Sequence, residues 1–150
     1  MRKTLVIATE EAMLQLAAML ASVIENGMVI YLNGPLGAGK TTFARGFLHG
    51  LGYHGKVKSP TFTLVEPYEL NGRFVYHFDL YRLSSAHALE EIGVREYFSP
   101  ASICLIEWPQ HGAPLLPPAD IIFHFGFAGE GREVIVEAVS DKGRKLIEQL

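Results

Sequence analysis

The stretch that organises this chain is Gly34-Pro35-Leu36-Gly37-Ala38-Gly39-Lys40-Thr41, which fills every fixed position of the pattern G-x-x-x-x-G-K-[ST]. The apolar run 28–32 before it is typical of a buried strand, and Phe43, Phe47 and Leu51 after it recur at helical spacing. Strand, glycine-rich loop and helix are the context in which this pattern cradles phosphate groups. The order therefore predicts a phosphate-binding loop.

The chemistry of phosphate binding explains these residue types. Glycines let backbone N–H groups curl around phosphate oxygens, and the N-terminus of the following helix adds a partial positive charge. Lys40 would reach the β- and γ-phosphates of a nucleotide, and the Thr41 hydroxyl would ligate Mg²⁺. The alternative, a glycine-rich turn beside an ordinary surface lysine, is disfavoured by the two correct flanks. We therefore expect a nucleoside triphosphate with Mg²⁺, bound by Gly37, Ala38, Gly39, Lys40, Thr41 and Thr42.

Composition places the chain among ordinary globular proteins and excludes several function classes. With 49% hydrophobic and 19% charged residues, residues 1–150 are expected to form one domain. A net charge of −3 gives no broad nucleic-acid footprint. The single cysteine, Cys104, lies in an apolar run and favours a reducing compartment. The apolar segment 12–24 is too short to span a bilayer, and no signal peptide precedes the first strand-like run. We therefore expect a cytoplasmic protein without membrane contact.

Turn signals predict a mixed sheet. Asn71-Gly72 between two strand-like runs is the strongest short-range signal of a β-hairpin, and Pro67 favours an edge strand. The fold class is therefore α/β, a three-layer sandwich of the P-loop NTPase type whose mixed sheet has a parallel core and antiparallel hairpins. The predicted elements are strand 4–8, helix 9–24, strand 28–32, a helix ending near 52, strands 61–65 and 73–79, a helix from Ser84 or Ser85 through Ile92 toward Phe98, strand 103–106, a hairpin of 121–127 with 133–139, and helix 141–150.

Two acids stand where a phosphate loop needs help with Mg²⁺, at the ends of apolar runs. Glu107 follows four apolar residues, and Asp79 follows a run that His77 interrupts. Both would lie at the carboxyl edge of the sheet, where ligands bind in open α/β folds. One acid can complete the Mg²⁺ shell with Thr41, and the other can hold a metal-bound water or orient the attacking one. The alternative is that either acid caps a turn. The candidate catalytic residues are Lys40, Asp79 and Glu107.

The segment between the phosphate loop and Asp79 resembles a nucleotide switch. Thr61 or Thr63 could close on Mg²⁺ and the γ-phosphate, although both could also be ordinary β-branched strand residues. His77 is expected to be a satisfied core residue, and Trp108 either a buried core residue, the favoured interpretation, or a partner contact. Five basic residues are candidates for stabilising transition-state charge, with none singled out: Arg45, Lys56, Lys58, Arg82 and Arg95.

The sequence gives only weak evidence about which nucleotide base the site would bind. The Asn-Lys-x-Asp element of guanine-specific switches is absent, which favours adenine by elimination. Thr9, Glu10 and Arg132 are candidate base contacts because of their positions in predicted loops.

Four segments in order closely resemble the TsaE (YjeE) family. They are Gly34 to Thr42 followed by Arg45-Gly46, Val57 to Glu66, Tyr76 to Arg82, and Ile106 to Pro109. The phosphate loop alone is generic, but the ordered set of four is highly specific, and the resemblance covers residues 28–118.

The resemblance implies a bacterial cytoplasmic ATPase needed to make threonylcarbamoyladenosine in tRNA. Such a protein does not transfer the carbamoyl group; it acts on the TsaB–TsaD pair and meets tRNA only through that complex. Carried over by motif, Lys40 and Thr41 serve phosphate and Mg²⁺, Glu107 serves Mg²⁺, and Asp79 serves metal or hydrolysis. Without an obvious stabilising arginine in the chain itself, turnover should be slow alone. The alternatives are a small-molecule kinase and a nucleotide-gated binding module that does not hydrolyse ATP.

Overall fold

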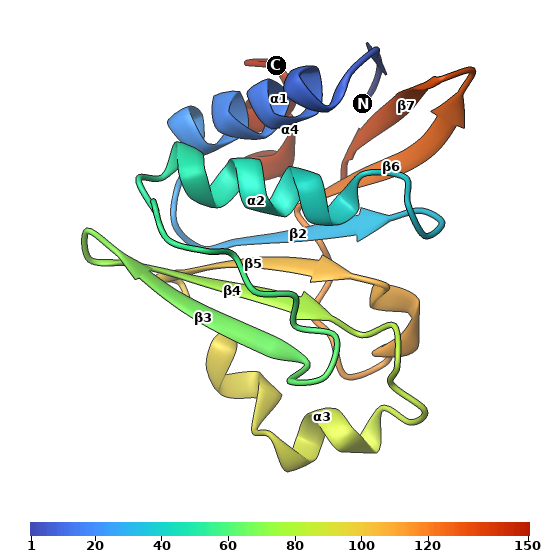
Figure 1. Ribbon diagram of the computed structural model, residues 1–150. Coiled ribbons are helices and arrows are strands. Elements are labelled where there is room, and N and C mark those ends of the chain that lie inside the picture. Colours follow the sequence, from blue (N-terminus) through green and yellow to red (C-terminus); the bar gives the residue numbers. More distant parts are fainter.

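A computed structural model describes all residues, 1–150, and shows a seven-stranded mixed sheet with helices on both faces (Figure 1). The strand order across the sheet is β1-β7-β6-β2-β5-β4-β3. The elements are β1 (Arg2–Ile7), α1 (Glu10–Val23), β2 (Met28–Asn33), α2 (Lys40–Gly50), β3 (Val65–Leu70), β4 (Arg73–Asp79), α3 (His87–Glu91), the 3₁₀ turn η1 (Val94–Tyr97), β5 (Ser102–Glu107), the 3₁₀ turn η2 (Pro109–His111), β6 (Ile121–Ala128), β7 (Gly131–Ala138) and α4 (Asp141–Ile147).

The centre of the sheet is parallel and its flanks are antiparallel. Strands β6, β2, β5 and β4 are parallel neighbours, whereas β3 pairs antiparallel with β4, and β7 pairs antiparallel with β6 and β1. All six residues of β5 are buried, as expected of a central parallel strand covered on both faces. The mixed sheet that the sequence predicts is confirmed. The carboxyl ends of β2, β5 and β4 meet at one edge.

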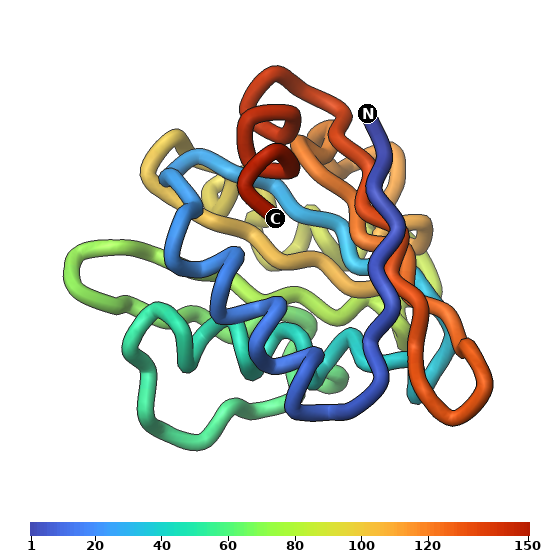
Figure 2. Tube along the Cα trace, turned by 90° about the horizontal axis from the view of Figure 1, so that it is seen from above, coloured from blue at the N-terminus to red at the C-terminus, as the bar shows by residue number.

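Three helices cover one face of this sheet and shorter elements cover the other (Figure 1). On the first face, α1 and α2 pack so closely that a Cβ at Gly46 or Gly50 would lie 3.0 or 2.8 Å from the backbone of α1. Figure 2 shows α1 beside α2, and β1 running along β7 at the side of the molecule. On the second face, α3, η1 and the segment 108–116 enclose a smaller apolar cluster. No helix combines the length and apolarity that crossing a bilayer requires.

Both predicted hairpins are present. Asn71 and Gly72 form the turn between β3 and β4 with φ of 53° and 80°, the left-handed conformation that Asn and Gly tolerate best. Strand β3, which contains Pro67, lies at the edge of the sheet as predicted. Strands β6 and β7 pair from Ile121 with Ala138 to Ala128 with Gly131, which leaves two residues in the second turn.

Two predicted elements are wrong in their extent. Residues 61–64 form a turn rather than a strand, because Leu64 has a φ of 69° and its N–H binds the carbonyl of Pro60. The predicted helix from Ser84 or Ser85 is only the short α3, which ends before Gly93, whose φ is 69°. Ser85 does accept a hydrogen bond from the N–H of His87 at 3.2 Å, but the residue before the helix is Ala86.

Candidate functional site

The phosphate-loop segment leads from the carboxyl end of β2 into the first turn of α2. Gly37 and Gly39 have φ of 79° and 111°, a conformation that glycine adopts at low cost. No side chain caps the N-terminus of α2, so the first backbone N–H groups of this helix remain available to a ligand. The predicted order of strand, glycine-rich loop and helix is therefore present.

A cavity of about 500 Å³ lies over this loop, within the range of pockets that hold small molecules. Most residues predicted to contact nucleotide line it, with Ala38 as the exception. Ala38 is fully buried, and its N–H binds the carbonyl of Pro35 at 3.3 Å. The predicted site residues that line the cavity are Gly37, Gly39, Lys40, Thr41, Thr42, Asp79 and Glu107.

Lys40 is the buried cation of the site. It is 4% exposed, donates a hydrogen bond to the carbonyl of Gly34, and has its Nζ 3.9 Å from the centre of the Trp108 ring. Burial lowers the pKa of Lys40, and the nearby carboxylates of Glu107 and Asp79 oppose that shift. No carboxylate lies close enough to form an ion pair with it, which leaves the ammonium group able to bind an anion.

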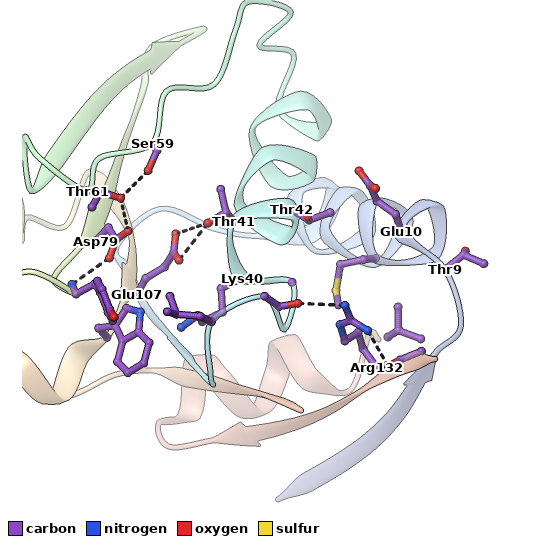
Figure 3. Close-up of a pocket in the computed structure, with 18 of the residues that line it drawn as sticks. Thr9, Glu10, Lys40, Thr41, Thr42, Ser59, Thr61, Asp79, Glu107 and Arg132 are labelled. Atoms are coloured by element: carbon purple, nitrogen blue, oxygen red, sulfur yellow. Dashed lines mark hydrogen bonds between the residues drawn. The ribbon is translucent and has the colours of Figure 1, made fainter. Parts of the chain in front are cut away.

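Asp79 and Glu107 end adjacent parallel strands and lie opposite each other in the register of β4 and β5. The Thr41 hydroxyl lies 3.3 and 3.5 Å from the two oxygens of Glu107 (Figure 3). Asp79 accepts hydrogen bonds at 3.0 Å from the Thr61 hydroxyl and from the N–H of Tyr81. The tertiary structure thus brings together Lys40, Thr41, Asp79 and Glu107.

The two threonines proposed for a switch lie in different surroundings. Thr61 lines the cavity, and its hydroxyl lies 2.8 Å from that of Ser59 and 3.0 Å from Asp79 (Figure 3). Thr63 bonds Glu66 at 3.1 Å and does not line the cavity. Of the two candidates, only Thr61 is placed to meet a ligand there.

The far wall of the cavity comes from the start of α1 and from the β6–β7 hairpin. Thr9, Glu10 and Arg132 all line it, as a base-binding region would require. Arg132 donates to the carbonyl of Gly37 at 3.1 Å, so it ties the hairpin to the phosphate loop (Figure 3). Arg45 is paired with Glu10 at 2.6 Å.

Most of the basic residues considered for charge stabilisation lie away from the cavity. Arg82 lines it, with its guanidinium 4.5 Å from the centre of the exposed Phe62 ring. Lys56, Lys58 and Arg95 do not line it.

Trp108 has a different place from the one that the sequence suggested, and His77 has a partner that the sequence did not indicate. Trp108 is half-buried rather than a core residue; it lines the cavity and has a φ of 58°, which is unusual for a bulky side chain. His77 is buried as expected, but its Nε2 lies 2.7 Å from Glu107. The only sign in the sequence was that His77 interrupts an apolar run. No residue close to His77 in the sequence indicates that Glu107 is its partner.

The donor set at the cavity fits a hard divalent cation such as Mg²⁺. The Thr41 hydroxyl and the Glu107 carboxylate are oxygen ligands of the kind Mg²⁺ prefers, and Asp79 adds a second carboxylate beside them. No three His, Cys, Asp or Glu side chains gather as a metal cage anywhere in the chain. Mg²⁺ commonly binds through one or two protein oxygens together with substrate phosphates, so these residues suffice.

Comparison with known proteins identifies the family. The family model described as threonylcarbamoyl adenosine biosynthesis protein TsaE matches residues 7–134. The chain is 49% identical to the tRNA threonylcarbamoyladenosine biosynthesis protein TsaE of Haemophilus influenzae, over 82% of this chain and 78% of that protein. It is 38% identical to the TsaE protein of Bacillus subtilis, over 90% of this chain and 85% of that protein. The crystal structure of Bacillus subtilis YdiB matches with a TM-score of 0.86 and 31% identity, over 99% of this chain and 93% of that one. The chain therefore belongs to the TsaE family of threonylcarbamoyladenosine biosynthesis proteins.

Proposed function

We propose that this protein is a P-loop ATPase that supports threonylcarbamoyladenosine modification of tRNA in the cytoplasm. It would bind and slowly hydrolyse Mg-ATP and act on a TsaB–TsaD pair, meeting tRNA only through that complex. The observation that carries the proposal is the convergence of Lys40, Thr41, Asp79 and Glu107 on one cavity beside an uncapped helix N-terminus. Membership of the TsaE family supports the tRNA pathway.

The phosphate-binding part of the proposal follows from charge and backbone geometry. The free N–H groups at the start of α2 would bind phosphate oxygens, and the helix dipole would favour their negative charge. Lys40 would exchange its bond to the Gly34 carbonyl for a phosphate oxygen and neutralise charge there. The Trp108 ring, whose centre lies 3.9 Å from Nζ, would help to keep the ammonium group in place during that exchange.

The two acids would divide the remaining work. Glu107 and Thr41 would hold Mg²⁺, which supplies charge neutralisation at the β- and γ-phosphates when bound. Asp79 uses one oxygen for Thr61 and the other for the N–H of Tyr81, and each carboxylate oxygen can accept a further hydrogen bond. Asp79 would therefore orient the attacking water, with its own position fixed by those two donors. Thr61 would couple ligand binding to the conformation of the segment 59–64.

Slow turnover by the isolated protein is expected from the positions of its arginines. Arg82 faces the Phe62 ring and Arg132 faces backbone carbonyls, so neither is held against the acids. An arginine placed at the transferred phosphoryl group can change kcat by about 10³–10⁵-fold. We therefore expect the partner complex to supply or reposition such a group.

The test is ATP turnover by the purified protein, alone and with a TsaB–TsaD pair, beside the variant Lys40→Ala. Stimulation by the pair that is lost in the variant supports the proposal. Equal turnover with and without the pair contradicts partner control of hydrolysis. A phosphorylated small-molecule product would favour a kinase, and docking that needs ATP but not its cleavage would favour a nucleotide-gated binding module.

A further inference from the structure

The shortest hydrogen bond of the Glu107 carboxylate lies beneath the cavity rather than inside it. His77 does not line the cavity, yet its fully buried Nε2 lies 2.7 Å from Oε2 of Glu107, whose side chain is 3% exposed. We propose that His77 is a positioning residue of the nucleotide site, which holds the Glu107 carboxylate so that its other oxygen faces Thr41 and the metal. This inference rests on the proposed function, since it assigns the metal a ligand that His77 orients.

The sheet register makes the contact possible. His77 pairs with Leu105 and Asp79 pairs with Glu107 across β4 and β5. Because side chains alternate between faces, His77, Asp79 and Glu107 all point to the face that α2 covers. His77 therefore lies one step behind the two acids, where solvent does not reach it. Its place is under the site and not in it.

The direction of the hydrogen bond follows from the chemistry of the two groups. An ionised carboxylate has no proton to give, so Nε2 must be the nitrogen that carries the hydrogen. The other ring nitrogen, Nδ1, is buried and has no hydrogen-bond partner. His77 therefore donates its Nε2–H to the Glu107 carboxylate.

The orientation of the Glu107 carboxylate depends on the His77 donor more than on any other. Its hydrogen bonds to the Thr41 hydroxyl are long, 3.3 and 3.5 Å, and Thr41 is itself expected to turn toward a metal. The His77 contact is the only one below 3 Å, and it uses Oε2. Oε1 thereby stays available toward α2. Partners that orient a metal ligand in this way typically change metal affinity by 10–100-fold when they are removed.

The experiment compares two conservative replacements of His77. In His77→Gln the side-chain amide can reach the position of Nε2, whereas in His77→Asn it reaches only the position of Nδ1. Both variants bury an amide, and a thermal melt establishes the folded fraction of each. The readout is the Mg²⁺ concentration that half-saturates binding of a fluorescent ATP analogue, which requires no turnover. His124→Gln is the control, because His124 makes a similar contact of 3.0 Å with Glu137 and neither residue lines the cavity.

We expect His77→Asn to raise the half-saturating Mg²⁺ concentration about 10–100-fold. His77→Gln should recover most of that loss, and His124→Gln should behave as the wild type. Wild-type Mg²⁺ dependence in His77→Asn would overturn the inference and leave the proposed function standing. An equal loss in both His77 variants would also overturn it, since a donor at the right position would then not matter. If the wild-type protein itself shows no Mg²⁺-dependent binding, the proposed function fails first.

Discussion

The two ends of the parallel strands differ in the polar groups that they bury and in the residues that adopt a strained backbone conformation. At the carboxyl end lie four of the five buried polar or charged residues, Lys40, His77, Asp79 and Glu107. The fifth, Ser102, starts β5 at the amino end, where its hydroxyl is paired with that of Ser99 at 2.8 Å. One end buries charge, and the other buries only a satisfied hydroxyl.

The backbone shows the same contrast. At the amino end, the left-handed residues are glycines and one asparagine, which accept that conformation readily: Gly27, Gly52, Asn71 and Gly72. At the carboxyl end, Leu64 and Trp108 have φ of 69° and 58°. Such residues cost of the order of 1–3 kcal/mol each and persist where the surroundings hold them. The amino end is built for stability, and the carboxyl end gives up stability to hold the site.

Replacing the buried lysine gives the largest expected effect on function. Lys40→Ala removes the only buried ammonium group of the cavity, so turnover should fall about 10²–10³-fold, as for loss of one charge-stabilising donor. ATP turnover and nucleotide binding measure this. Lys58→Ala is the matched control, because Lys58 is exposed and does not line the cavity. Equal losses in the two variants would contradict a special role for the carboxyl end.

The largest expected effect on stability lies at the amino end. A Cβ at Gly143 would lie 1.9 Å from the carbonyl oxygen of Asp120, so Gly143→Ala must move α4 or the start of β6. We expect a loss of about 3 kcal/mol in the free energy of unfolding, at the upper end for overpacking. Urea denaturation measures it.

The same variant tests whether the two ends are independent. Turnover per folded molecule should remain close to the wild-type value, because Gly143 and Asp120 do not line the cavity. Lys145→Ala, an exposed change on the same helix, should leave both quantities unchanged. Lost turnover in fully folded Gly143→Ala would show that the ends are coupled.

A smaller effect is expected where the hairpin meets the phosphate loop. Arg132→Gln removes the guanidinium that binds the Gly37 carbonyl at 3.1 Å. Nucleotide affinity should fall about fivefold, since one partly exposed hydrogen bond contributes about 1 kcal/mol. Isothermal titration calorimetry with Mg-ATP measures this, and Arg144→Gln on α4 serves as the control. A wild-type affinity would mean that the loop holds its shape without the hairpin.

The smallest effect depends on pH and lies on β6 and β7, at residues that do not line the cavity. The hydrogen bond from His124 is the main reason that the pKa of Glu137 is lowered, with Arg2 adding to it and burial opposing. A lowered pKa stabilises the fold above the unfolded value of 4.5, and this contribution disappears as the pH falls through the folded value. His124→Ala should therefore cost a few tenths of a kcal/mol at neutral pH, because the pair is partly exposed.

Thermal melts at neutral and acidic pH check this prediction. The difference between His124→Ala and the wild type should disappear once Glu137 is protonated in both. A difference that persists unchanged at acidic pH would point to packing rather than charge.

Local patterns in the sequence were sufficient for the strand, glycine-rich loop and helix around Lys40, for both hairpins and for the placement of two acids at strand ends. Each of these depends on neighbours within a few residues: glycines that permit a turn, an Asn-Gly pair, or an apolar run that ends in a carboxylate. The extents of segment 61–65 and of the helix after Ser85 were wrong because single left-handed residues, Leu64 and Gly93, interrupt them. A side chain such as Leu64 gives no local sign of that conformation.

The tertiary structure alone decided which of these groups meet. Thr41 lies 66 positions from Glu107, and Arg132 lies 95 positions from Gly37, so no short window of sequence contains either pair. The choice of Thr61 over Thr63, the place of Trp108 against Lys40 and the position of His77 beneath Glu107 all depend on strand order and on which face each side chain occupies. The residue types indicate the chemistry, because single side chains and short loops carry it out. The order β2-β5-β4 selects the partners, since only the folded sheet sets one strand end beside another.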